Sequence, residues 1–121
     1  MRNMILFALL LTALAAPALA GDYPVDGKWG QSNSSEKGPI DCGKLRVIEF
    51  KGDTRTDSSG GVPAYRNKSI SADGKSFRVV DEFTTGQIRN GSTSYKMSQS
   101  DADHLEMDQQ KGGAIKLRRC K

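Results

Sequence analysis

Apolar and polar residues alternate in short runs along most of the chain, a two-residue period typical of β-strands with one buried face. Clusters of glycine, asparagine, aspartate and serine, which favour turns, separate the runs. After residue 20 no long stretch repeats apolar residues at helical spacing. The pattern predicts an all-β antiparallel barrel or sandwich of seven or eight strands. Seven can be bounded: 27–32, 44–51, 65–71, 76–85, 92–98, 103–109 and 114–120.

Two stretches depart from simple alternation. In the strand 44–51, apolar residues occupy both faces, which predicts a bulge or a strand buried on both sides. Residues 52–63 are mostly polar and include the serine–glycine cluster 58–61, so we expect a mobile loop there.

Asp73-Gly74 is a strong signal for a hairpin between the third and fourth predicted strands. A two-residue loop at these positions fixes which residues oppose one another. The opposed pairs are Ile70 and Phe77, Lys68 and Val79, and Arg66 and Asp81. If this face points inward, Arg66, Lys68 and Asp81 form a polar lining inside the barrel. The alternative is that they lie near the barrel mouth and reach solvent.

The last hairpin contains a three-residue loop, Lys111-Gly112-Gly113, that suits a turn ending in a left-handed glycine. The apolar faces of its two strands coincide only if opposed residues have numbers that are both odd or both even. This register opposes Met107 and Leu117 on the inner face, and Glu106 and Arg118, with Asp108 and Lys116, on the outer face. We expect the outer pairs to be solvated salt bridges.

The inward positions of these strands define the predicted hydrophobic core. A domain this short buries a modest fraction of its surface, so a covalent cross-link is useful. The predicted core residues are Trp29, Leu45, Val47, Phe50, Phe77, Val79, Phe83, Tyr95, Met97, Leu105, Met107, Ile115 and Leu117.

Residues 1–20 predict a helical signal peptide. Arg2 precedes an uncharged apolar stretch over 4–16, and Ala18-Leu19-Ala20 is a small-x-small pattern recognised by signal peptidase. The stretch is shorter than the roughly 20 residues of a membrane-spanning helix. We therefore predict cleavage after Ala20 and one mature domain over residues 21–121. We expect no stable membrane insertion after cleavage, and a periplasmic or secreted location at a bacterial envelope.

The chain's net charge is +4, and removal of Arg2 leaves about +3 on the mature domain. Acidic and basic residues are interspersed, and aromatic residues are not interleaved with basic ones. Nucleic acid is therefore not the expected partner.

The two cysteines, Cys42 and Cys120, predict a disulfide, because exported proteins mature in oxidising compartments. The bond would close a loop of about 80 residues and stabilise the fold by roughly 4 kcal/mol in the chain-entropy model. Tying the end of the chain to an early strand favours a barrel. A redox or metal role is the alternative, but the sequence has no CxxC spacing.

Catalytic signals are sparse. His104, Glu106 and Asp108 lie on one strand face, but their spacing of roughly 6.5–7 Å suits a single metal ion poorly. His104 is the only histidine, and no GxSxG or other activated nucleophile is present. We expect no enzyme activity, cofactor or metal, although paired carboxylates leave a hydrolase open.

Gly27-Lys28-Trp29 resembles the G-x-W start of the calycin β-barrels, which include lipocalins, avidins and bacterial metalloprotease inhibitors. The resemblance implies a single up-and-down barrel. In lipocalins the tryptophan plugs one barrel end and an arginine from the last strands packs across it. By resemblance, this barrel plug is Trp29 with Arg118 or Arg119.

The C-terminal Gly112-Gly113…Leu117-Arg118-Arg119 is similar to the last strand of the metalloprotease inhibitors, which are exported, eight-stranded and disulfide-bonded. The two resemblances cover about 15 residues. Those inhibitors insert an N-terminal segment into the protease cleft, whereas here only residues 21–26 precede the first strand, and the disulfide loop is longer. The layout of Trp, Cys and Leu-Arg-Arg-Cys is also similar to small periplasmic proteins of alphaproteobacteria, which implies no activity.

We therefore expect a monomeric, non-catalytic binding protein of the cell envelope, with a protease as one candidate partner. The partner would contact an N-terminal arm made of Gly21, Asp22, Tyr23, Pro24 and Val25. The first alternative is a barrel that holds a small ligand, and the second is a small periplasmic hydrolase.

Overall fold

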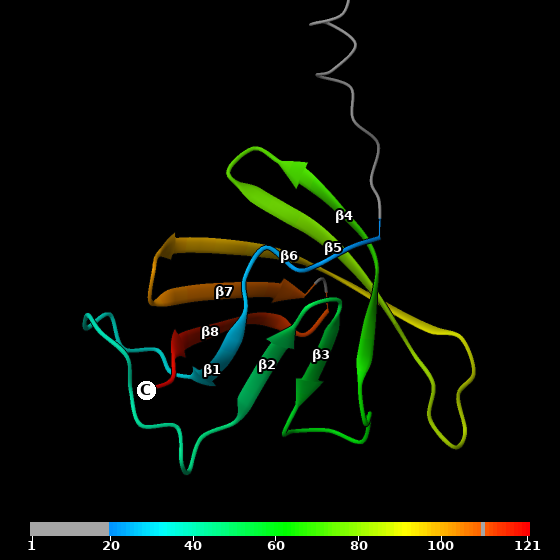
Figure 1. Cartoon of the computed structure of the whole chain (residues 1–121), viewed down its shortest axis with the longest axis horizontal. Coiled ribbons are helices and arrows are strands. Elements are labelled where there is room, and N and C mark those ends of the chain that lie inside the picture. The colour runs from blue at the N-terminus through cyan, green and yellow to red at the C-terminus, as the bar shows by residue number, and fades with distance from the viewer. Residues whose placement is uncertain (1–19, 110) are drawn as a thin grey trace, which may run out of the picture.

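Eight antiparallel strands close into a barrel in which every strand pairs with its neighbours in sequence and the last pairs with the first (Figure 1). The computed structural model describes residues 20–109 and 111–121, so the predicted signal peptide lies outside this part apart from Ala20. The strands are β1 (Gly27–Gln31), β2 (Val47–Lys51), β3 (Thr54–Asp57), β4 (Tyr65–Asp73), β5 (Ser76–Phe83), β6 (Gly91–Asp101), β7 (His104–Gln109) and β8 (Gly113–Arg119). The predicted all-β barrel is confirmed. No described residues form a helix that could span a membrane.

The strand β3 lies inside the stretch that the sequence predicted to be a loop. Lys51 pairs with Thr54, so Gly52 and Asp53 form a two-residue turn between β2 and β3. Gly52 adopts a φ of 62°, which a residue with a side chain rarely adopts. The alternation of β3 was missed because its inward residue is a charged Arg55 instead of an apolar one.

One continuous hydrophobic core fills the barrel. It contains nine of the thirteen predicted residues, and it also includes Tyr23, Val25 and Ile48, which were not predicted. Leu45 and Phe77 are 38% and 36% exposed, and Val47 and Phe83 are only half-buried, so these four predictions are wrong. In β2 the inward face is that of Ile48 and Phe50 alone, and no two-sided burial occurs.

Both predicted hairpin registers are displaced by two residues. The first loop is Gly74-Lys75, and Ile70 opposes Val79 instead of Phe77. In the last hairpin Gln109 pairs with Gly113, and Met107 opposes Ile115 instead of Leu117. Each loop begins one residue away from its predicted position, which changes every opposed pair but leaves the same side chains on each face.

The displacement also changes the predicted outer ion pairs. Glu106 opposes Lys116 instead of Arg118, and Asp108 opposes Ala114. Gly113 does adopt the predicted left-handed conformation, with a φ of 76°.

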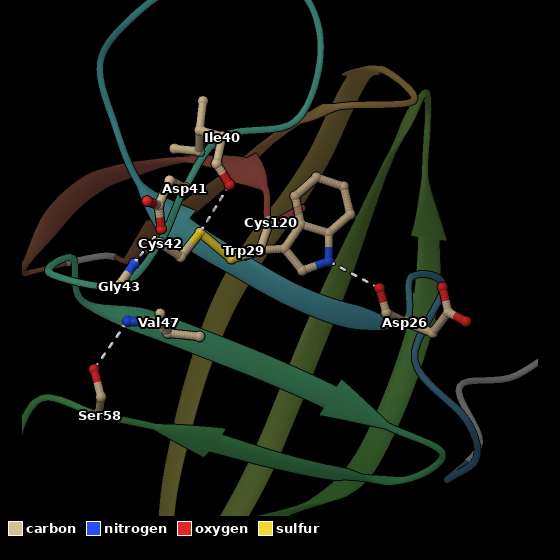
Figure 2. Close-up of a disulfide and its surroundings, with 9 residues drawn as sticks. All are labelled: Asp26, Trp29, Ile40, Asp41, Cys42, Gly43, Val47, Ser58 and Cys120. Carbon is tan, nitrogen blue, oxygen red and sulfur yellow. Dashed lines mark hydrogen bonds between the residues drawn. A yellow bond between two sulfur atoms is a disulfide. The ribbon is translucent and has the colours of Figure 1, made fainter.

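The predicted disulfide joins Cys42 to Cys120 and fastens the long β1–β2 loop to the end of the chain (Figure 2). Ile40 forms a parallel bridge with Cys120, and the N–H of Cys120 donates to the carbonyl oxygen of Lys28 in β1. The disulfide lies so close to β1 that a Cβ added at Gly30 would be 2.5 Å from the Cys42 sulfur. Glycine at position 30 is therefore a requirement of the cross-link.

Replacing Gly30 with alanine should push Cys42 or β1 out of position. We expect Gly30→Ala to lower the free energy of unfolding by about 1–3 kcal/mol, the usual cost of overpacking. Urea denaturation measures this change. Gly86→Ala is the matched control, since nothing lies within 4 Å of a Cβ at that position. Equal stabilities of the two variants would contradict the steric argument.

Candidate functional site

A buried carboxylate, Asp81 in β5, gathers donors from four other parts of the chain. The hydroxyl of Tyr23 donates to its Oδ1 at 2.9 Å, and the hydroxyl of Tyr95 in β6 donates to its Oδ2 at 2.8 Å. Arg55 in β3 donates through Nε to Oδ2 at 2.9 Å, and Asn67 in β4 donates to Oδ1 at 3.4 Å. Both carboxylate oxygens thus have two protein donors, as a fully buried charge requires.

The charge of Asp81 is balanced by Arg55, and the two side chains are 0% and 3% exposed. The Arg55 guanidinium carbon also lies 3.8 Å from the ring centroid of Tyr65 and 5.1 Å from that of Tyr95. Burial alone would lower the pKa of Arg55, but the neighbouring Tyr95 and Asp81 raise it overall. The guanidinium therefore stays charged between two aromatic faces and the carboxylate.

Burial raises the pKa of the Tyr23 and Tyr95 hydroxyls far above the usual value, and the charge of Asp81 raises both further. Both tyrosines therefore remain protonated donors across the physiological pH range. Neither tyrosine hydroxyl is therefore poised to exchange a proton near neutral pH, and the role of both in the cluster is to donate hydrogen bonds to Asp81.

The predicted polar lining needs correction. Asp81 does lie inside, but Arg66 and Lys68 are exposed on the outside of the barrel. The residues that accompany Asp81 are Arg55 and Asn67. Asn67 was missed because a bulge between Asn67 and Ser69 reverses the faces of the residues that precede it in β4. The Gly52-Asp53 pair between two short runs was a hairpin signal that could have revealed Arg55.

The N-terminal arm packs onto the barrel and closes it. Tyr23 and Val25 are buried, and the Tyr23 ring meets Phe50 edge-to-face at 4.9 Å. The N–H of Tyr23 donates to the carbonyl oxygen of Gly52, and the N–H of Gly21 donates to Asn67 Oδ1 at 3.1 Å. Two of the five residues predicted to form a partner-binding arm, Tyr23 and Val25, therefore belong to the core, and the other three remain exposed.

The barrel plug consists of Trp29 and Arg119. The Arg119 guanidinium carbon lies 4.4 Å from the centre of the Trp29 ring, and the indole N–H donates to the carbonyl oxygen of Asp26 at 2.9 Å (Figure 2). Arg118 points to the other face and donates to the carbonyl oxygens of Lys37 and Gly38, so it fastens the β1–β2 loop instead.

Three hollows in the part of the chain that the structure describes open to solvent. The first, of about 630 Å³, adjoins the disulfide and Asp57. The second, of about 290 Å³, lies between the serine-rich start of the β1–β2 loop and His104. The third, of about 490 Å³, is bordered by Arg66 and by the half-buried Tyr65 and Phe83.

The hydrogen bonds of the His104 ring go to the turn residue Asp101 and not to Glu106 or Asp108 on its own strand. Its Nδ1 lies 2.8 Å from Asp101, and this hydrogen bond lowers the pKa of the Asp101 carboxyl. Among the described residues, no three histidine, cysteine, aspartate or glutamate side chains are placed to hold a metal ion. The arrangement is that of a side-chain hydrogen bond at the β6–β7 turn.

No protein-family model, curated protein or solved structure matches this chain. The closed eight-stranded antiparallel barrel is consistent with the calycin-like architecture that the G-x-W start implied.

A second ion pair, at the far end of β3, joins Arg46 to Asp57. Their closest atoms are 2.6 Å apart, and the Asp57 side chain is largely buried. Burial alone would raise the pKa of Asp57, but the hydrogen bonds from Arg46 and from the Ser59 N–H hold it below its usual value. The pair therefore stabilises the fold only while Asp57 is ionised.

Removing the charge of Asp81 should strongly destabilise the barrel, because Arg55 would remain buried without a counter-ion. We expect Asp81→Asn to lower the free energy of unfolding by about 3–5 kcal/mol in urea denaturation. Asp108→Asn is the matched control, since Asp108 is exposed, and its cost should stay within about 0.5 kcal/mol. A small effect at position 81 would show that the cluster does not hold the barrel together.

Replacing Arg46 with methionine should cost stability in a pH-dependent way. Above the unfolded-state pKa of the Asp57 carboxyl, about 3.9, the free energy of unfolding of wild type should exceed that of Arg46→Met by about 1–2 kcal/mol. This difference should disappear as the pH falls through the lower folded-state pKa of Asp57. Urea denaturation between acid and neutral pH measures it, with the exposed Lys44→Met as control. A difference that stays constant with pH would exclude Asp57 as its source.

Proposed function

We propose that the mature chain is an exported, non-catalytic protein of the cell envelope that binds a protein partner with the outside of its barrel. The single observation that supports this most is the filled interior. Trp29, Phe50, Tyr95, Met97 and Met107 are all essentially buried within one core. A barrel filled in this way leaves recognition to its outer strands and loops.

The closed arm and the disulfide support the same proposal. The arm seals the core with Tyr23 and Val25, and the Cys42–Cys120 bond fastens the longest loop. A rigid frame of this kind loses little conformational freedom when its surface binds another protein. A small-ligand function would depend on the open outer hollows instead of an enclosed cavity.

The finer proposal, inhibition of a protease, rests on the resemblance at the two ends of the chain. An inhibitor that used residues 21–25 would first have to withdraw Tyr23 and Val25 from the core, which removes hydrophobic contacts and a hydrogen bond to Asp81. If the chain inhibits a protease, we expect contacts from the barrel surface with the arm still in place.

Capture of partners from cell-envelope extract tests the proposed function. The protein is expressed from its complete sequence, exported, purified with a C-terminal tag and cross-linked in the extract. Its intact mass should show loss of residues 1–20. We expect a specific protein partner by mass spectrometry, and no small molecule retained in native spectra of the purified protein. A retained small molecule without any cross-linked protein would overturn the proposal.

A further inference from the structure

The strand β4 is much longer than the part of it that β3 covers. β3 pairs with β4 only at Thr54 with Arg66 and at Arg55 with Tyr65, and the N–H of Asn67 reaches Asp53. Beyond this point β4 continues to Asp73, paired with β5 alone. Figure 1 shows the far halves of β4 and β5 extending past the β2–β3 turn. In the described part of the chain, no strand pairs with residues 69–73 on the side away from β5.

The hairpin geometry identifies which backbone groups face this free edge. The loop Gly74-Lys75 closes on Asp73 and Ser76, which are the hydrogen-bonded ends of the turn. Antiparallel ladders alternate between bonded and non-bonded pairs, so Ser71 bonds to β5 while Ile70 and Ala72 direct their N–H and C=O groups away from it. These groups are the ones that an added strand would use.

Basic side chains surround the free edge. Four are exposed beside the uncovered part of β4, on β4, β5, β6 and the hairpin loop, whereas Asp73 is the exposed acid of this part of the β4–β5 hairpin. Asp73 forms ion pairs with two of these basic residues, because its carboxylate lies 4.0 Å from Arg78 and 3.9 Å from Lys96. The four basic residues are Lys68, Lys75, Arg78 and Lys96. The surroundings of the edge therefore carry a net positive charge, while β4 itself presents Ser69, Ser71 and Asp73 on the outer face.

The inner face of the same edge is apolar. Ala72 is exposed and opposes Phe77, whose side chain is 36% exposed, and Ile70 packs against the core. Alternate side chains of an added strand would meet this apolar strip on one face and Ser69, Ser71 and Asp73 of β4 on the other, with Arg78 and Lys96 behind them on β5 and β6. A second copy of the chain would bring two sets of basic residues together, so self-pairing is disfavoured.

We infer that the free edge of β4 binds an extended segment of the partner protein by strand addition, and that this segment alternates acidic and apolar residues. This inference rests on the proposed function, because it specifies how the partner is held. Backbone hydrogen bonds to Ile70 and Ala72 supply the pairing, and the basic residues of the outer face select acidic side chains.

The test uses two acetylated hexapeptides as probes, one alternating valine with glutamate and the other valine with lysine. Each is titrated into the exported protein, and the amide NMR signals of Ile70 and Ala72 report binding. We expect the glutamate peptide to shift these signals and the lysine peptide not to. Raising the salt concentration should weaken the binding. Equal effects of the two peptides, or none from either, would overturn the inference.

Ala72→Pro removes one outward N–H and leaves the β5 ladder intact, so it should weaken glutamate-peptide binding by about tenfold or more. Ala72→Thr, which keeps the N–H, is its control and should bind as wild type does. Arg78→Glu tests the charge independently if the proline variant fails to fold, and it should also weaken binding severalfold. Wild-type affinity in a folded Ala72→Pro variant, or in Arg78→Glu, would overturn the inference.

Envelope capture separates this inference from the proposed function. If wild type captures a protein and Ala72→Pro captures it equally well, the partner binds elsewhere and only the edge assignment fails. If wild type captures no protein, the proposed function fails, whatever the peptides do. Dimerisation of the free protein in analytical ultracentrifugation, abolished by Ala72→Pro, would assign the edge to a second copy and overturn the inference.

Discussion

The rest of the barrel depends on one constraint, which is that the buried carboxylate of Asp81 must be surrounded by donors. The donors come from the arm, β3, β4 and β6, through Tyr23, Arg55, Asn67 and Tyr95. Because an unpaired buried charge is costly, these segments have to meet around β5. The cluster thereby joins β3 to β5 across β4, where the ladder between β3 and β4 covers only two residue pairs.

This constraint also shapes what the molecule can do. Tyr23 reaches Asp81 only if the arm lies on the barrel. The same placement of the arm therefore covers the barrel end and supplies the Tyr23 hydrogen bond to the carboxylate. The interior is then filled, so the proposed recognition of a partner would use outer surfaces such as the hollows and the uncovered part of β4. Because β3 is short, the Asp81 cluster can join β3 to β5 across β4. The short β3 is also the reason that β4 has a free edge.

The sequence predicted the architecture well and individual partners less well, for a physical reason. Side chains in a strand alternate with a period of two, so a loop displaced by one residue keeps every inward residue inward. Met107 and Ile115 are therefore core residues as predicted, although they oppose each other unexpectedly. Pattern alone failed where a charge points inward, as at Arg55, and where the arm leaves the strands, as at Tyr23.

Alternation and turn residues predicted an all-β barrel or sandwich with most of its core, because these follow from local chemistry. The two cysteines predicted the disulfide and, with the G-x-W resemblance, favoured the barrel. An inward Asp81, two residues after Val79, was one of two alternatives that the sequence left open. Only the tertiary structure decided which residue neutralises that carboxylate. It also decided that Arg119 and not Arg118 covers Trp29, and that β4 extends beyond β3. These features depend on relative strand lengths and on a bulge, which arise when distant segments compete to satisfy the same buried groups.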